Sequence, residues 1–313
     1  MARSSARWLP WLVVVTTLAV AGVLVTWSAT SSSSDQRSTR ATSAPRTPAP
    51  TLESLVEAPA QVPSVPSAPP VAARALVAAA EEAAPEMTLG VAVLDVHTGE
   101  LVVGGDGERL FMAASLSKLI LAVDVLDRHR AEERSLDPAD LELLTRALSA
   151  SDDNAMNVLW GRFDGAGGVD RVATRLGLSA SLPAGSAEMW GDIEVTAADM
   201  VRLYRHVLRD MAPEDGAVIV GALAAARAVA TDGFEQHYGL LHQGASPEHY
   251  AKQAWVPYSP AGYLLHTAGV VYDGRTGHAY AIALLSIQPH AGEQVARDRL
   301  STVAAAAMAT LGG

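Results

Sequence analysis

The first hydrophobic run of the chain covers residues 8–27, none of which is charged. At about 1.5 Å per residue this run forms a helix about 30 Å long, which is enough to cross a bilayer. Arg3 and Arg7 precede it, and arginines before a span keep the N-terminus inside the cell. The pattern predicts a single-pass protein of the cell membrane with an extracellular domain. The alternative is a secreted protein with a cleaved signal peptide, since Ala19-Val20-Ala21 has the small residues of a cleavage site.

Polar and proline-rich sequence follows the hydrophobic run. Residues 29–70 are rich in Ser, Thr and Pro, and eight of the 17 prolines fall between Pro45 and Pro70. Such a segment cannot bury enough apolar surface to fold, so we expect a disordered linker. The predicted organisation is therefore an N-terminal membrane anchor or signal at 1–28, this linker, and a folded domain at 71–313.

Within the folded domain, strand-like runs lie near both ends and helical patterns lie between them. Hydrophobic runs at 87–105 flank a turn at 97–99, and further runs at 262–288 flank a turn at 273–277. Each arrangement is typical of a β-hairpin. Because hairpins so far apart in the sequence enclose one domain, we expect them to join in one antiparallel sheet.

Helical patterns account for most of the remaining residues. Residues 71–84 and 299–311 are alanine-rich, and most of 115–230 has helical spacing that is broken by Gly and Pro. The predicted fold class is α/β, with an antiparallel sheet flanked by helices and a mostly helical subdomain at about 119–215.

Composition excludes several functions. The net charge is −11 and no basic cluster lies outside the N-terminal region, so we expect no nucleic-acid partner. The absence of cysteine removes disulfides, cysteine nucleophiles and a lipid-anchored cysteine. His237, His242 and His249 match no familiar metal-binding spacing, so we expect neither a metal nor another cofactor. We expect a monomer.

The stretch AASLSKLILAVDVL, residues 113–126, places Ser115 and Lys118 at the start of a hydrophobic helix. At this spacing both side chains lie on one face, with Ser115 at the positive end of the helix dipole. A lysine in an apolar segment is costly unless it is partnered or deprotonated, and a partly neutral lysine can activate a serine hydroxyl. The alternative is an ordinary helix start, because this spacing arises about once by chance in a chain of this length.

Two other motifs have a structural and a chemical interpretation. In SASDDNAMNVLW, the residues Ser151-Asp152-Asp153-Asn154 can cap a helix at 155–162. In YAKQAW, Lys252 heads a short β-like segment and by itself is typical of an edge strand.

Taken in order, these motifs resemble the Ser-x-x-Lys, Ser-Asp-Asn and Lys-Thr-Gly set of class A β-lactamases and penicillin-binding proteins. The lead-in RLFMAASLSK and the later VTAADMVRLYRHV are similar to segments of the same family. The resemblance covers about residues 71–313 and extends to exported β-lactamase-like serine hydrolases of high-GC Gram-positive bacteria. It implies a class A β-lactamase/DD-peptidase-like fold.

The resemblance also implies roles for individual residues. Ser115 would be the acylated nucleophile and Lys118 its base. Ser151 would pass a proton to the leaving nitrogen, and Lys252 would supply positive charge to that relay and to a substrate carboxylate. The backbone N–H groups of Ser115 and Trp255 would form the oxyanion hole.

Several positions depart from the family pattern. Asp153 replaces asparagine, and a carboxylate cannot donate to a substrate carbonyl, although it can pair with Lys118. Gln253-Ala254 replaces Thr-Gly after Lys252. The segment in the place of the omega loop is short, with Glu188 as a possible deacylating base; an exposed loop glutamate is the alternative.

The sequence therefore leads to two hypotheses about function. The first is an exported serine hydrolase that forms an acyl-enzyme at Ser115 with a β-lactam or a peptide derived from peptidoglycan. The second is a catalytically impaired relative that binds peptidoglycan or a partner protein.

Overall fold

Residues 71–84, 86–132 and 135–312 are described by a computed structural model. The predicted anchor or signal at 1–28 and the predicted linker at 29–70 lie outside the described residues. Among the residues described, no helix has both the length and the apolar character that crossing a membrane requires.

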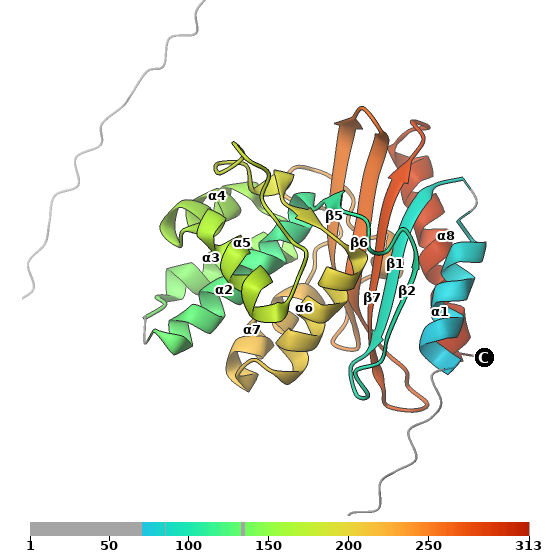
Figure 1. The fold of residues 1–313 in the computed structure, drawn as a ribbon, viewed down its shortest axis with the longest axis horizontal. Coiled ribbons are helices and arrows are strands. Elements are labelled where there is room, and N and C mark those ends of the chain that lie inside the picture. Colours follow the sequence, from blue (N-terminus) through green and yellow to red (C-terminus); the bar gives the residue numbers. More distant parts are fainter. Residues whose placement is uncertain (1–70, 85, 133–134, 313) are drawn as a thin grey trace, which may run out of the picture. The chain divides into compact units, whose positions relative to one another are not determined.

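A five-stranded antiparallel sheet forms the centre of the structure (Figure 1). Its order is β2-β1-β7-β6-β5, so the first two strands of the domain pair with the last three through β1 and β7. The strands are β1 (Thr88–Asp95), β2 (Leu101–Gly105), β5 (His249–Ser259), β6 (Gly262–Tyr272) and β7 (Ala279–Gln288). Both predicted hairpins and their union in one sheet are confirmed.

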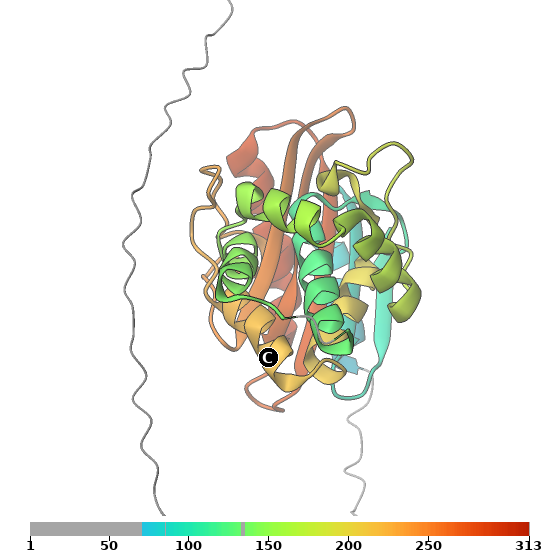
Figure 2. The same ribbon diagram turned by 90° about the vertical axis from the view of Figure 1, so that its left-hand side faces the viewer.

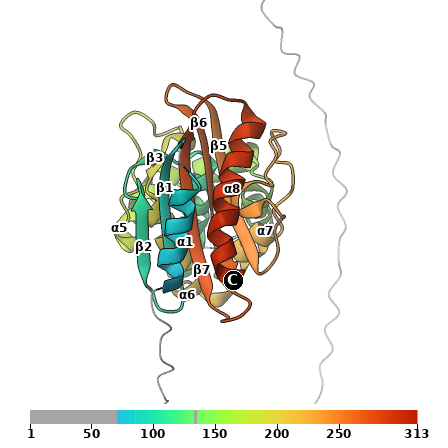
Figure 3. The same cartoon turned by 90° about the vertical axis from the view of Figure 1, so that its right-hand side faces the viewer.

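Helices α1 (Val71–Glu82) and α8 (Glu293–Gly312) pack side by side on one face of the sheet (Figure 3). Alternate side chains of β7 point to this layer, among them Ile282 and Leu284. Their neighbours Ala283 and Leu285 point to the opposite layer. Because both faces of the sheet are covered, β7 is almost continuously hydrophobic.

The other face of the sheet is covered by the helical part of the domain (Figures 1 and 2). Helix α6 lies directly against β1 and β7. The helices here are α2 (Ser117–Ala131), α3 (Pro138–Ser149), α4 (Asp153–Arg162), α5 (Gly165–Leu176), α6 (Ala197–Arg209) and α7 (Pro213–Ala224). A small second sheet pairs β3 (Phe111–Met112) with β4 (Glu194–Val195), which precedes α6. The architecture confirms the predicted α/β class with an antiparallel sheet flanked by helices.

Three helix starts differ from the prediction. Helix α4 begins at Asp153, two residues before the predicted start. The last helix begins at Glu293 rather than near Arg299, because a polar first turn precedes its hydrophobic part. The helix expected to begin at Ser115 begins at Ser117, after the 3-10 turn η1 (Ala114–Leu116).

Helix α2 is buried through most of its length and is held by an ion pair as well as by apolar packing. Asp124 on α2 is fully buried and accepts hydrogen bonds from Arg171 of α5, at 3.0 Å from Nε and 2.7 Å from Nη2. Arg128 Nη1 lies farther from the same carboxylate, at 3.4 Å. A paired charge of this kind is tolerated in a core because its partners replace the lost water.

Replacing Arg171 with Met is expected to lower the free energy of unfolding by about 3 kcal/mol, because Asp124 keeps its buried charge and loses its bidentate partner. Urea unfolding followed by circular dichroism measures the change. The matched control is Arg109→Met, which removes an arginine from an exposed pair with Asp106 at 3.8 Å and is expected to change stability by less than about 1 kcal/mol. Equal losses in the two variants would contradict the anchoring role of Arg171.

Candidate active site

Ser115 lies in η1, directly before α2, and its backbone surroundings are strained. Ala114 has φ of 45° and Ser151 has φ of 50°, which places both in the left-handed region that residues with a Cβ rarely adopt. Strained backbone of this kind persists where the surrounding structure over-determines it, and such places include active sites. The strained residues are therefore Ala114, which directly precedes Ser115, and Ser151, whose hydroxyl contacts that of Ser115.

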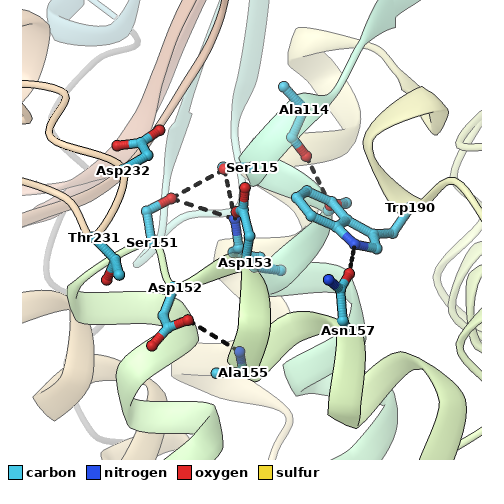
Figure 4. Close-up of polar contacts among 12 residues, drawn as sticks. Ala114, Ser115, Ser151, Asp152, Asp153, Ala155, Asn157, Trp190, Thr231 and Asp232 are labelled. Carbon is cyan, nitrogen blue, oxygen red and sulfur yellow. Dashed lines mark hydrogen bonds and ion pairs between the residues drawn. The ribbon is translucent and has the colours of Figure 1, made fainter. Parts of the chain in front are cut away.

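The side chains of Ser115, Lys118, Ser151 and Lys252 form one hydrogen-bonded cluster, which we call the serine–lysine cluster. Lys118 Nζ donates to Ser115 Oγ at 2.7 Å and lies 3.4 Å from Ser151 Oγ. Ser151 Oγ donates to Ser115 Oγ at 3.0 Å and accepts from Lys252 Nζ at 3.0 Å. In Figure 4, Ser115 lies between Ser151 on one side and Trp190 on the other. The structure therefore brings together the four side chains that the three motifs supply.

Lys118 is positioned by the first turn of α2 and its side chain is buried. Its Nζ lies 4.4 Å from the ring centre of Trp190. Burial holds the pKa of Lys118 below its usual value, while the negative charge and hydrogen bond of Asp153 act in the opposite direction. Burial has the larger effect, so the neutral amine forms more readily than in an exposed lysine.

The neutral form of Lys118 fits its hydrogen-bond partners. As an ammonium it has three N–H groups for three nearby acceptors: Ser115, Ser151 and Asp153. A neutral amine keeps two N–H groups and gains a lone pair. It can therefore retain its bonds to Ser151 and Asp153 and accept the hydroxyl proton of Ser115.

Lys252 lies within β5, an edge strand, yet only 1% of it is exposed. The interpretation of Lys252 as an ordinary, solvent-facing lysine of an edge strand is therefore wrong. Its Nζ donates to Ser151 Oγ at 3.0 Å and to the carbonyl oxygen of Gln253 at 2.9 Å. Burial and the nearby positive charge of Lys118 hold the pKa of Lys252 well below its usual value.

Ser151 and Asp153 are positioned by the start of α4. Asp152 caps this helix by accepting from the backbone N–H of Ala155 at 3.1 Å, and Arg146 holds the capping carboxylate. The predicted helix cap is confirmed. With Asp152 occupied in this way, Asp153 turns its more exposed carboxylate to Lys118 at 2.7 Å.

Replacing Asp153 with Asn is expected to raise the rate of acylation at neutral pH by up to about tenfold, since removing an anion beside Lys118 lowers the pKa of the lysine. The sign follows from the neutral form: a lower pKa increases the fraction of neutral base at any given pH below it. The acid limb of the pH–rate profile should therefore move to lower pH. Stopped-flow measurement of the acylation rate across about pH 5–9 determines the shift.

The control for this experiment is Asp170→Asn, which changes the net charge equally at an exposed position of α5. It is expected to leave the profile in place. If Asp153→Asn also leaves the profile in place, the carboxylate does not control the protonation of Lys118.

A cavity of about 320 Å³ opens beside the serine–lysine cluster. Ser115 and Trp255, whose backbone N–H groups were predicted to form an oxyanion hole, both line it. They come from η1 and β5, which pack against one another. Asp153, Trp190, Asp192 and Asp232 also line this cavity, which we call the Ser115 cavity.

Gln253, which replaces the threonine of the family motif, faces away from the Ser115 cavity. Its buried Nε2 donates to the carbonyl oxygens of Gln236, at 3.0 Å, and Tyr238. The side chain is thus used to fasten the loop before β5. The position following Lys252 offers no hydroxyl for a substrate carboxylate.

Glu188 is exposed in the turn before η2 (Trp190–Asp192) and does not line the Ser115 cavity. Asp192, four residues later in the same segment, does line it, as does Asp232 from the loop before β5. Neither aspartate was predicted from the sequence to be a site residue. Proximity to Glu188 was the only signal for Asp192, and nothing local distinguished Asp232.

Comparisons with known proteins identify a matching family profile, related sequences and structures of similar fold. The profile of the Beta-lactamase enzyme family matches residues 72–139. Proteins described as "Putative lipoprotein LppW" from Mycobacterium tuberculosis and Mycobacterium bovis are each 33% identical to this chain over 212 residues. The aligned region is 67% of this chain and 66% of the mycobacterial protein, so the chain covers just under two thirds of that relative.

Solved β-lactamase structures share the fold. The TLA-3 extended-spectrum β-lactamase is 15% identical with a TM-score of 0.63, covering 77% of this chain and 100% of its own. A class A β-lactamase from Bacteroides cellulosilyticus is 18% identical with a TM-score of 0.62, covering 76% of this chain and 99% of its own. These likenesses confirm the predicted class A β-lactamase-like fold.

Proposed function

The chain belongs to the β-lactamase-like superfamily, and from this premise we propose that it is a serine hydrolase that forms an acyl-enzyme at Ser115. The observation that carries the proposal is the serine–lysine cluster at the wall of the Ser115 cavity. A serine with only a structural role would not need two buried lysines, one bonded to its own hydroxyl and one to the hydroxyl of Ser151. The proposed substrate is an amide, either a β-lactam or a cell-wall peptide.

In the proposed reaction, neutral Lys118 removes the proton from Ser115 while Ser115 Oγ attacks the substrate carbonyl carbon. The distance of 2.7 Å between Lys118 Nζ and Ser115 Oγ lies within the range that direct proton transfer needs. A new C–O bond forms, and the negative charge moves to the carbonyl oxygen. The backbone N–H groups of Ser115 and Trp255 would stabilise this oxyanion, a contribution of about 2.7–4 kcal/mol per donor.

Collapse of the tetrahedral intermediate breaks the C–N bond, and the leaving nitrogen must receive a proton. Ser151 would deliver it, because its hydroxyl contacts both Ser115 and the two lysines. Lys118 returns the proton to Ser151, so the serines and lysines end the step in their original protonation states apart from the ester at Ser115. Lys252 would hold Ser151 in place throughout.

The test is mass spectrometry of the intact protein after incubation with benzylpenicillin and, separately, with a neutral 4-nitrophenyl ester. Acylation by penicillin adds the whole mass of the reagent because the ring opens without losing a fragment. Peptide mapping should locate the adduct on Ser115, and Ser115→Ala should abolish it. No adduct with either reagent, from a folded protein, would overturn the proposal.

The second candidate function is that of a catalytically impaired relative that binds peptidoglycan or a protein. It is favoured by the ion pair of Asp153 with Lys118, which opposes deprotonation of the base, and by the inward-facing Gln253. In that case soluble muropeptides would bind wild type and Ser115→Ala with the same affinity in calorimetry, and neither protein would form an adduct.

We further propose that the domain is exported and held at the cell membrane by the hydrophobic run at 8–27. The support comes from the sequence pattern and from a relative described as a lipoprotein. This chain contains no cysteine, so its attachment would depend on the hydrophobic segment rather than on a lipidated thiol.

Fractionation of cells that express the full chain is expected to place it in the membrane fraction, with the domain accessible to protease added outside. Deletion of residues 8–27 should leave the protein inside the cell. A mature, freely soluble protein in the medium that begins near Gly22 would instead show that a signal peptide is cleaved.

A further inference from the structure

The described residues that line the Ser115 cavity include three aspartates and no lysine or arginine. The carboxylates of Asp153, Asp192 and Asp232 come from three separate segments and meet at the cavity that contains Ser115. Asp153 is neutralised in part by Lys118, at 2.7 Å. The other two aspartates form no ion pair within the described part of the chain.

The hydrogen-bond partners of these two aspartates are neutral. Asp232 accepts from the backbone N–H of Phe234 at 2.9 Å and from the indole N–H of Trp255 at 3.2 Å. Asp192 is half-buried and accepts from the hydroxyl of Ser186 at 3.1 Å. Neutral donors orient a carboxylate without cancelling its charge. Figure 4 shows Asp232 near Ser151, on the side of Ser115 that is opposite to Trp190.

The lysines of the site do not offset this charge for a ligand. Lys118 and Lys252 are buried, and their amines already contact Ser115, Ser151, Asp153 and the carbonyl oxygen of Gln253. Burial lowers the pKa of both lysines, and the negative charges of Asp153 and Asp232 act in the opposite direction. The three carboxylates outnumber the two lysines even when both lysines are charged. The cavity therefore presents a negative potential next to its nucleophile.

We infer that the Ser115 cavity selects acyl substrates that carry a positively charged group, such as an alkylammonium, which Asp192 and Asp232 hold beside Ser115. This inference rests on the proposed function, because it names the substrate class of the same site. It differs from what the family resemblance implies, which is recognition of a substrate carboxylate by the region around Lys252. Here Gln253 faces away from the cavity, and a substrate carboxylate would be repelled by Asp192 and Asp232.

The test uses three 4-nitrophenyl esters with acyl chains of one length. One chain ends in a trimethylammonium group, one in its neutral tert-butyl counterpart and one in a carboxylate. The rate of nitrophenolate release and the mass of the Ser115 adduct are measured for each ester. A unit charge about 4 Å from one carboxylate changes rates by about tenfold, so we expect the order cationic, neutral, anionic, with steps of about tenfold at low salt.

Variants test whether the two aspartates cause the selection. Asp192→Asn and Asp232→Asn should each lower the ratio of the cationic to the neutral rate by about three- to tenfold and raise the ratio of the anionic to the neutral rate. A residue that only supports the fold would change all three rates together. The matched control is Asp170→Asn, which removes one negative charge from an exposed position that does not line the cavity, and it should leave both ratios as they are.

The outcomes separate the two proposals. Adducts at Ser115 with equal rates for all three esters, or ratios that neither aspartate variant changes, would overturn the inference and leave the proposed function standing. No adduct with any of the esters would overturn the proposed function, and the inference with it. The expected order of rates together with opposite changes of the two ratios would support both.

Discussion

Replacing Lys118 with Ala is expected to lower the rate of acylation at Ser115 by about 10²–10⁴-fold, which is the usual contribution of a positioned general base. The reason is geometric, since Lys118 Nζ lies 2.7 Å from the nucleophilic oxygen. The fold should survive the change. Burial already holds the pKa of Lys118 below its usual value, so the folded state gains little from its charge. Asp153 is left without its partner, but its side chain is 56% exposed and can be hydrated.

The comparison variant is Lys118→Arg, which keeps a positive charge and hydrogen-bond donors but cannot lose a proton near neutral pH. It should be as slow as Lys118→Ala if the lysine acts as a base. Acylation is measured by stopped-flow with the neutral 4-nitrophenyl ester, and thermal unfolding monitors the fold of each variant. An acylation rate in Lys118→Ala equal to that of wild type would mean that Ser115 and Lys118 only begin a helix.

The second large effect concerns the fate of the acyl-enzyme, which we expect to last for minutes or longer. Hydrolysis of the ester needs a base that activates water, and an omega-loop glutamate has this role in class A enzymes. The nearest counterpart here, Glu188, is exposed and does not line the Ser115 cavity. Time-resolved mass spectrometry after mixing with benzylpenicillin, or with the 4-nitrophenyl ester where penicillin reacts slowly, follows the adduct at Ser115.

Two variants make this expectation specific. Glu188→Gln should leave the lifetime of the adduct unchanged, because the side chain faces solvent. Asp192→Asn is the variant to compare with Glu188→Gln, since Asp192 belongs to the same segment and lines the cavity. Rapid return to free enzyme that Glu188→Gln abolishes would mean that the loop closes on substrate and that the protein is an efficient β-lactamase. Rapid return that Asp192→Asn abolishes would assign the base to that residue.

The sequence by itself was sufficient to predict most of the helices and strands of the main sheet and the motifs of this protein. Strand and helix patterns are local: β7 is almost continuously hydrophobic and is covered on both faces, and α2 begins at Ser117, within the predicted apolar run. Contacts one helical turn apart are also local, which is why the pairing of Ser115 with Lys118 could be predicted. The replacement of asparagine by Asp153 was likewise visible in the sequence.

Only the tertiary structure decided which distant side chains meet and which way they face. Lys252 reaches Ser151 across 101 positions of sequence, and β5 is an edge strand whose lysine is nevertheless buried. Gln253 faces inward and Glu188 faces solvent, although both stand in place of family residues that serve the site. Asp192, at the end of η2, and Asp232, in the loop before β5, line the Ser115 cavity, and neither lies in a periodic stretch of sequence. Side-chain direction in such loops depends on packing between distant segments, which no local sequence pattern records.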